Sequence, residues 1–167
     1  VQAGGSDLIF PHHDLSAAHS VALGRPFAAA YAHSGMVGYQ GEKMSKSLGN
    51  LVFVHRLVRE GTDPMVIRLV LMAHHYRSDW EWTDGELARA AERLESYRLA
   101  ARRGDHSPAT VEALRAALRD DLDTVRALEA LDAWAEGGSS SGAETDPAAP
   151  GDVPAAMDAL FGITLQS

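Results

Sequence analysis

The sequence contains no cysteine, which excludes a disulfide framework and any thiolate metal site formed by this chain alone. No apolar run approaches the ~20 residues that cross a bilayer. The best candidate, residues 65–73, is short and is interrupted by Arg68. No basic-then-apolar signal peptide opens the sequence. Of the 167 residues, 46% are hydrophobic and 23% are charged, so we expect a soluble globular protein of the cytoplasm.

Positive charge is scarce in the second part of the sequence. Residues 101–167 hold 5 basic and 12 acidic side chains, whereas residues 1–100 hold 10 and 11. Proteins that bind nucleic acids gain most of their affinity by neutralising phosphates, so this acidic part argues against such a role. Only two of the 15 basic residues are lysines, Lys43 and Lys46, and they lie within four residues of each other. The opening Val1 and the glycine turn after it suggest a piece of a longer protein.

The local patterns predict a small α/β segment followed by a helical bundle. Residues 1–10 resemble the end of a strand and a turn, and Pro11 precedes a helix over 13–23 that Gly24 closes. That helix is expected to bury Leu15, Ala18, Val21 and Ala22. Residues 27–40 are predicted to be extended or short-helical, and 41–50 form a polar loop. Further helices are predicted at 53–60, from Pro64, from a capping box at 83–86 to 103, from Ser107-Pro108, from Thr124, and at 154–161.

Both lysines belong to the sequence Lys43-Met44-Ser45-Lys46-Ser47 in the polar loop. Ammonium groups on such a loop can neutralise the charge that develops when pyrophosphate leaves a triphosphate. Elsewhere the chain uses arginine, so lysine here indicates a need for a compact point charge. A solvated surface loop is the alternative, since most polar runs are solvated. The whole pattern favours phosphate binding.

The turn Gly4-Gly5-Ser6-Asp7 is a second candidate. Glycines allow a ligand to approach the backbone, and an acidic side chain at such a turn can accept hydrogen bonds from ribose hydroxyls. Taken alone, this sequence fits an ordinary turn better, but beside the lysine loop it favours a nucleotide. The adjacent His12 and His13 lie at a predicted helix start, where a histidine is commonly a cap or a surface residue.

Three segments in this order, GGSDLIFPHH, GEKMSKSLGN and HYRSD, resemble cysteinyl-tRNA synthetase. They equally resemble its paralogue, the mycothiol-pathway ligase that joins cysteine to glucosaminyl-inositol, and KMSKS is the signature of class I aminoacyl-tRNA synthetases. The resemblance implies that residues 1–62 are the second half of a Rossmann-like nucleotide-binding domain. Residues 63–136 would then be a junction helix and helical bundle, 137–152 a flexible linker, and 153–167 a C-terminal helix and tail. His74-His75-Tyr76-Arg77 would brace the domain junction, and the three tryptophans are expected to pack.

The resemblance also assigns roles to single residues. Lys43 and Lys46 would be catalytic and contact the phosphates of ATP, which binds with Mg²⁺. The remaining ATP-binding residues would be Gly4, Gly5, Ser6, Asp7, Met36, Val37, Met44, Ser45 and Ser47, with backbone groups near Met36 and Val37 at the adenine. His12 would be a ligand of the Zn²⁺ that grips the cysteine thiolate, with further ligands expected upstream of Val1.

One departure and the acidic bundle favour the ligase. Cysteinyl-tRNA synthetases have a glutamate four residues after this histidine, where this chain has Ser16. The expected reaction activates L-cysteine as cysteinyl-adenylate and transfers it to the amine of glucosaminyl-inositol, releasing AMP and pyrophosphate. The partners would be these small molecules, with no nucleic acid or membrane, and the enzyme would be a monomer. The alternatives are a cysteinyl-tRNA synthetase, or an inactive fragment that acts as a binding module.

Overall fold

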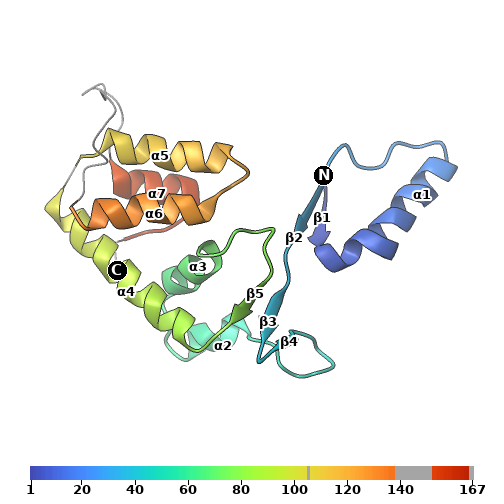
Figure 1. The fold of residues 1–167 in the computed structure, drawn as a ribbon, viewed down its shortest axis with the longest axis horizontal. Coiled ribbons are helices and arrows are strands. Elements are labelled where there is room, and N and C mark those ends of the chain that lie inside the picture. Colours follow the sequence, from blue (N-terminus) through green and yellow to red (C-terminus); the bar gives the residue numbers. More distant parts are fainter. Residues whose placement is uncertain (105, 138–151, 166–167) are drawn as a thin grey trace. The chain divides into compact units, whose positions relative to one another are not determined.

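The computed structural model describes residues 1–104, 106–137 and 152–165 of the chain, which forms two compact units (Figure 1). The first unit contains residues 1–51 and 76–83, and the second contains 52–75 and the described part of 84–167. The predicted domain boundary was at residue 62, whereas the first stretch of the first unit ends at Leu51. Residues 52–62 belong to the helical unit, and residues 76–83 return to the first unit because a strand within them pairs with a strand of that unit.

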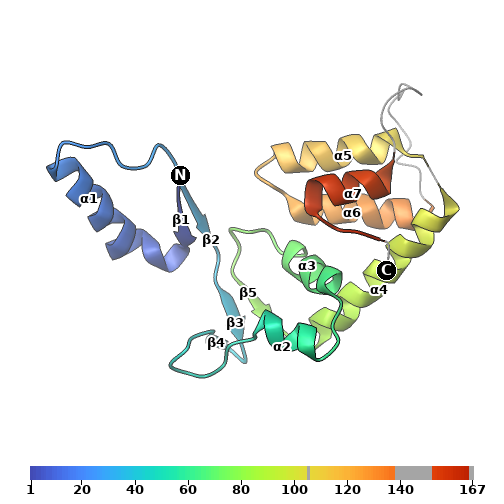
Figure 2. The same ribbon diagram turned by 180° about the vertical axis from the view of Figure 1, so that it is seen from behind.

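The first unit begins with a β-α-β arrangement. Strand β1 (Gln2–Gly5) pairs in parallel with β2 (Tyr31–Ser34), so that Gly4 lies opposite His33. A 3₁₀ turn η1 (Ser6–Leu8), a π-helical turn η2 (Ile9–His13) and helix α1 (Asp14–Ala22) connect the two strands. Parallel strands need such a crossover connection, and Figures 1 and 2 show the chain passing from β1 through α1 to β2. The predicted strand and helix are confirmed, whereas Gly4 and Gly5 end the strand and the turn itself is formed by Ser6–Leu8.

The predicted burial of α1 is wrong for the described residues. Leu15 is 49% exposed and Val21 is 70% exposed, and Ala18 and Ala22 are exposed as well. The spacing of these residues makes one apolar side, as expected. However, a sheet of two short strands offers too little surface to cover a helix, so the apolar side of α1 stays open to solvent in this structure.

A second small sheet has the strand order β4-β3-β5. Strand β3 (Val37–Tyr39) pairs antiparallel with β4 (Glu42–Lys43) and parallel with β5 (Trp80–Trp82). Gln40 and Gly41 join β3 to β4 with positive φ angles of 58° and 77°. Positive φ at both positions is what a tight two-residue hairpin needs. Glu42 and Lys43 of the predicted polar loop 41–50 are therefore in a strand, and Lys43 lies on the edge of this sheet.

The second unit is helical and contains α2 (Val54–Arg59), α3 (Pro64–Met72), α4 (Gly85–Arg103), α5 (Pro108–Arg119), α6 (Thr124–Ala135) and α7 (Val153–Phe161). Each was predicted within a few residues. Helix α4 begins at Gly85, within the predicted start at 83–86, and the N-cap residue Asp84 makes no side-chain cap. In its first turn, Glu86 pairs with Arg89, and the Glu86 carboxylate lies 3.7 Å from Nε2 of His74. Helix α6 is capped by Asp123, whose carboxylate accepts a hydrogen bond from the backbone of Arg126, rather than by Thr124.

The core of the second unit consists of fully buried side chains from α3 to α7 and the segment after α7. The largest are Leu69, Leu94, Tyr97, Leu114, Leu128, Leu131, Met157 and Ile163. In α3, Leu69 is fully buried and Leu71 is exposed. Trp82, in the first unit, and Trp134 are buried, as predicted for packing residues. Residues 138–151 of the predicted linker lie outside the described residues. Among the described helices, none combines the length and apolarity required to cross a bilayer.

Candidate active site

The glycine turn packs closely against its surroundings. A Cβ atom added to Gly4 would lie 2.8 Å from Cε1 of His13. One added to Gly5 would lie 2.6 Å from Oδ1 of Asp7 and 3.2 Å from Sδ of Met36. A side chain at either position would have to displace these neighbouring side chains, so glycine fits both positions without rearrangement. The Asp7 carboxylate and the Met36 side chain therefore both lie close to Gly5.

The glycine turn and the lysine loop touch through one ion pair. Nζ of Lys43 donates a hydrogen bond to Oδ2 of Asp7 at 2.6 Å, although the two residues are 36 positions apart in sequence. Their side chains are 50% and 42% exposed, so a ligand can reach both. The hydrogen bond from Lys43 lowers the pKa of Asp7 below its ordinary value, so Asp7 is a carboxylate at neutral pH. The structure thus brings the two predicted motifs together.

The two lysines of the loop lie in different surroundings. Lys43 ends strand β4, and the chain continues through Met44, whose N–H donates to the carbonyl of Val37 at 3.2 Å. The side chain of Ser45 accepts a hydrogen bond from the backbone of Leu48 at 3.2 Å and lies 3.1 Å from the hydroxyl of Ser47. Lys46 is exposed on the turn, and its ammonium group has no hydrogen bond or ion pair within the described residues. Lys46 is therefore available to a ligand, whereas Lys43 is held by Asp7.

The segment 76–79 supports the residues before β3. The N–H of Gly35 donates to the carbonyl of Tyr76 at 2.7 Å, and the Met36 N–H donates to Oδ1 of Asp79 at 2.7 Å. A Cβ atom on Gly35 would collide with the backbone of Ser78. His74–Arg77 were predicted to lie at the domain junction, and the chain passes from one unit to the other between His75 and Tyr76. Asp79 was not among the predicted site residues, because nothing in the sequence pairs it with Met36.

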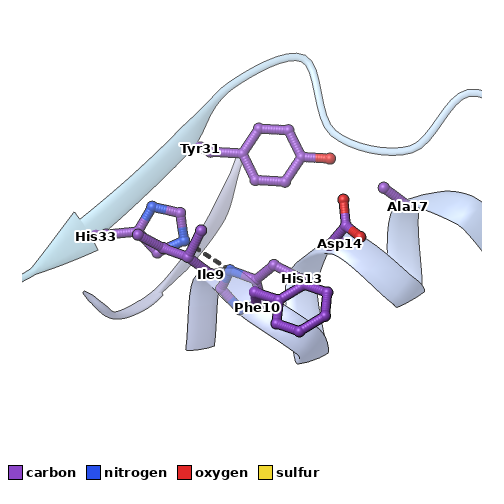
Figure 3. Close-up of a pocket in the computed structure, with 7 residues that line it drawn as sticks. All are labelled: Ile9, Phe10, His13, Asp14, Ala17, Tyr31 and His33. Carbon is purple, nitrogen blue, oxygen red and sulfur yellow. Dashed lines mark hydrogen bonds between the residues drawn. The ribbon is translucent and has the colours of Figure 1, made fainter. Parts of the chain in front are cut away.

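His13, not His12, is the buried histidine of the pair (Figure 3). Nδ1 of His13 lies 2.8 Å from Nε2 of His33, within hydrogen-bonding distance, and this contact links η2 to strand β2. His13 and His33 line a pocket of about 340 Å³, and the other lining residues are Ile9, Phe10, Asp14, Ala17 and Tyr31. Sequence reasoning found the two adjacent histidines but had no means to predict which one is buried.

His12 is exposed, and Ser16 donates its hydroxyl hydrogen bond to the His12 carbonyl at 2.8 Å. This bond ties the Ser16 hydroxyl to the backbone one turn earlier. The described ranges contain no group of three or more histidine, cysteine, aspartate or glutamate side chains that could hold a metal ion. The exposed imidazole of His12 can therefore supply one zinc ligand, but the described residues do not complete a zinc site.

Comparison with known proteins places the chain in a family. The model of the tRNA synthetases class I (C) catalytic domain matches residues 1–92, which is more than half of the chain. The chain belongs to this family. The matched part contains the whole first unit, helices α2 and α3, and the beginning of α4. The glycine turn, the lysine loop and the segment 76–79 are therefore all parts of a class I synthetase catalytic domain.

Curated relatives extend the match over the remaining helices. The ligase of Brachybacterium faecium named L-cysteine:1D-myo-inositol 2-amino-2-deoxy-alpha-D-glucopyranoside ligase is 98% identical over all 167 residues. Proteins of the same name from Thermomonospora curvata and Streptomyces coelicolor are 56% and 57% identical over 99% of the chain. The chain spans about 40% of the length of these relatives.

A solved structure supports the fold. The ternary complex of Agrobacterium radiobacter K84 agnB2 LeuRS with tRNA and LeuAMS aligns with 80% of this chain and 22% of its own, with a TM-score of 0.55 and 20% sequence identity. At this identity the likeness concerns the fold alone. It agrees with the expected architecture, in which part of a class I synthetase nucleotide-binding domain is followed by a helical bundle.

Proposed function

We propose that this chain is part of an ATP-dependent ligase that joins L-cysteine to the amine of glucosaminyl-inositol. The names of relatives with 98% and 56% identity support the reaction. The observation that carries the proposal is the contact between Asp7 and Lys43. It joins a carboxylate suited to ribose hydroxyls and an ammonium group suited to phosphates in one exposed site, which is the pairing that a bound ATP requires.

In the proposed first step, a carboxylate oxygen of cysteine attacks the α-phosphorus of ATP. The bond from that phosphorus to pyrophosphate breaks, which gives cysteinyl-adenylate and pyrophosphate. Negative charge grows on the leaving pyrophosphate, and Lys46 can approach it without giving up a protein contact. Lys43 would exchange Asp7 for a phosphate, which frees the Asp7 carboxylate to accept hydrogen bonds from the ribose.

In the second step, the amine of glucosaminyl-inositol attacks the acyl carbon of the adenylate. The bond from this carbon to the AMP oxygen breaks, AMP leaves, and the amine nitrogen loses a proton as the amide forms. The balance is one ATP consumed for one amide bond, with AMP and pyrophosphate released. Mg²⁺ accompanies ATP as part of that substrate.

Most of the backbone groups near Met36 and Val37 that could bind adenine already have hydrogen-bond partners within the protein. The Met36 N–H is already bonded to Asp79, the Met36 carbonyl accepts from the N–H of Trp80 at 3.1 Å, and the Val37 carbonyl accepts from Met44. The Met36 side chain lies beside Gly5 and is half-buried. We therefore propose that Met36 meets the adenine ring with its apolar side chain rather than with its backbone N–H.

Zinc enters the proposal only through His12. When bound, Zn²⁺ would hold the substrate thiolate and so favour cysteine over serine. His12 offers one imidazole for this purpose, and the other ligands would come from outside this chain. The described residues contain no group of three or more ligating side chains, so we derive no catalytic step through the metal.

A cysteinyl-tRNA synthetase is the second candidate, and the name of the matching family model favours it. The acidic balance of residues 101–167 and the presence of Ser16 in place of a glutamate favour the ligase. The proposal includes a monomeric, cytoplasmic enzyme that acts on small molecules and uses no nucleic acid or membrane partner. A binding module without catalysis would bind neither cysteine nor ATP productively.

Exchange of radioactive pyrophosphate into ATP tests the first step. The full-length protein should catalyse exchange that depends on L-cysteine, and L-serine, which lacks the thiol, should support far less. Absence of cysteine-dependent exchange at saturating ATP would refute both the ligase and the synthetase and leave the binding module.

A further inference from the structure

Asn50 closes the lysine loop with two hydrogen bonds from one side chain. Its Oδ1 accepts from the backbone N–H of Ser45 at 2.8 Å, and its Nδ2 donates to the backbone carbonyl of Lys43 at 3.3 Å. The side chain is half-buried, and the bond to Ser45 is partly shielded from water. Asn50 is also the only asparagine among the 167 residues. The expected site residues did not include it.

The two backbone groups that Asn50 contacts lie on one edge of an extended segment. In a strand, the carbonyl of one residue and the N–H of the second residue after it point to the same side. The intervening N–H of Met44 points the other way and donates to Val37 in β3. The carboxamide of Asn50, which carries a donor and an acceptor like a peptide group, therefore occupies the place of a neighbouring strand beside residues 43–45.

We propose that Asn50 is a positioning residue for both lysines of this loop. The catalytic role of the lysines rests on the proposed function, and their positioning by Asn50 rests on the two hydrogen bonds described above. By fixing the peptide groups on both sides of Met44, Asn50 sets the direction of the Lys43 side chain toward Asp7. By joining the end of the loop to its start, it fixes the turn on which Lys46 is exposed.

Contacts inside the turn do not replace this closure. The Ser45 hydroxyl contacts Leu48 and Ser47, and the Gly49 N–H donates to the Lys46 carbonyl at 3.3 Å. These bonds shape residues 45–49, but none of them reaches the backbone of Lys43. Asn50 alone, among the described side chains of this loop, bonds to the residue that ends β4.

The chemistry of the amide gives a graded set of variants. Asn50→Ala removes both bonds. Asn50→Asp keeps nearly the same shape and can accept from Ser45, but a carboxylate cannot donate to the Lys43 carbonyl and repels it. Gln40→Asn is the matched control, because it changes another amide side chain on the adjacent hairpin turn. Asparagine tolerates the positive φ of 58° at that position.

The test measures pyrophosphate exchange and amide hydrogen exchange in the full-length protein. We expect Asn50→Ala to lower kcat for exchange by roughly 10- to 100-fold, the effect of misplacing a catalytic group by about 1 Å. The KM for cysteine should stay within about twofold, because the loop does not hold that substrate. Without nucleotide, the Ser45 amide should exchange at least about tenfold faster, and the melting temperature should stay near that of the parent, since these bonds lie near the surface. Asn50→Asp should fall between Asn50→Ala and the parent, and Gln40→Asn should match the parent.

Several results would overturn the inference. An exchange kcat within twofold of the parent in Asn50→Ala, or unchanged protection of the Ser45 amide, would remove Asn50 from this role. An equal loss in kcat and in cysteine affinity, with a lower melting temperature, would make its role purely structural. Full activity in Asn50→Asp would refute the importance of the bond to Lys43. If the parent shows no cysteine-dependent exchange, the proposed function fails, and amide exchange alone decides whether Asn50 holds the loop.

Discussion

Replacing Lys46 with alanine should slow adenylate formation without changing the free energy of unfolding. The ammonium group of Lys46 contacts no other group in the described part of the chain, so its removal costs no folded-state interaction. A surface substitution of this kind changes the free energy of unfolding by no more than about 0.5 kcal/mol. In the transition state, by contrast, the same group would neutralise charge on the departing pyrophosphate. Loss of one preorganised group of this type slows a reaction by roughly 100- to 1,000-fold.

Single-turnover formation of cysteinyl-adenylate in the full-length protein is the assay. Lys46→Ala should lose this rate while its urea denaturation midpoint matches the parent. Lys46→Arg, which keeps the charge but spreads it over a planar group, should recover part of the rate. Adenylate formation within threefold of the parent in Lys46→Ala would remove Lys46 from the mechanism and refute the reasoning from its exposed position.

Three further predictions concern other contacts. Because the hydrogen bond from Lys43 lowers the pKa of Asp7, their pair is present above that lowered value and is lost only as the pH falls through it. Lys43→Met should therefore raise the Asp7 pKa toward its ordinary value in a carboxyl NMR titration, and an unchanged pKa would contradict the contact. In the full-length protein, His12→Ala should lower zinc content and the preference for cysteine over serine together, whereas full zinc occupancy would make His12 an ordinary surface residue. Tyr97 is fully buried and donates to Asp132 at 2.7 Å, so Tyr97→Phe should lower the free energy of unfolding by about 1 kcal/mol in urea denaturation, and an unchanged midpoint would show that the bond adds nothing.

Local chemistry explains why the helices were predictable. Proline in the first turn of α3 and α5, with Asp63 and Ser107 before them, marks where those helices begin, because these caps satisfy backbone donors within three residues. Gly24 and Gly61 have positive φ and follow the ends of α1 and α2. Signals of this kind act over a few residues and can be recognised in a sequence.

Contacts over long distances along the chain were not predictable in the same way. The pairing of β3 with β5 and the bond from Met36 to Asp79 join residues about 40 positions apart, and no local pattern encodes them. The predicted burial of the apolar side of α1 was also wrong, because burial depends on which surfaces lie beside a helix and not on the periodicity of its sequence. The resemblance named both Asp7 and Lys43 as ATP-binding residues, but their contact became visible only in the structure.

Asn50 is an instructive omission. Asn50 ends the segment GEKMSKSLGN that carries the resemblance, but the roles that the resemblance assigns in this segment stop at Ser47. A signal was present, because the chain uses asparagine only there, just as it uses lysine only in this loop. The reason for that choice needs coordinates, since it lies in two backbone groups that face one side of an extended segment.

The most direct test of the central claim is to identify the molecule that accepts the cysteinyl group. The full-length protein would receive ATP, L-cysteine and zinc, with glucosaminyl-inositol and cysteine tRNA offered in parallel, and the products would be identified by mass together with AMP release. The proposed function predicts a cysteinyl amide on the amino sugar and none on the tRNA. Cysteinyl-tRNA as the only product would contradict it and establish the synthetase instead.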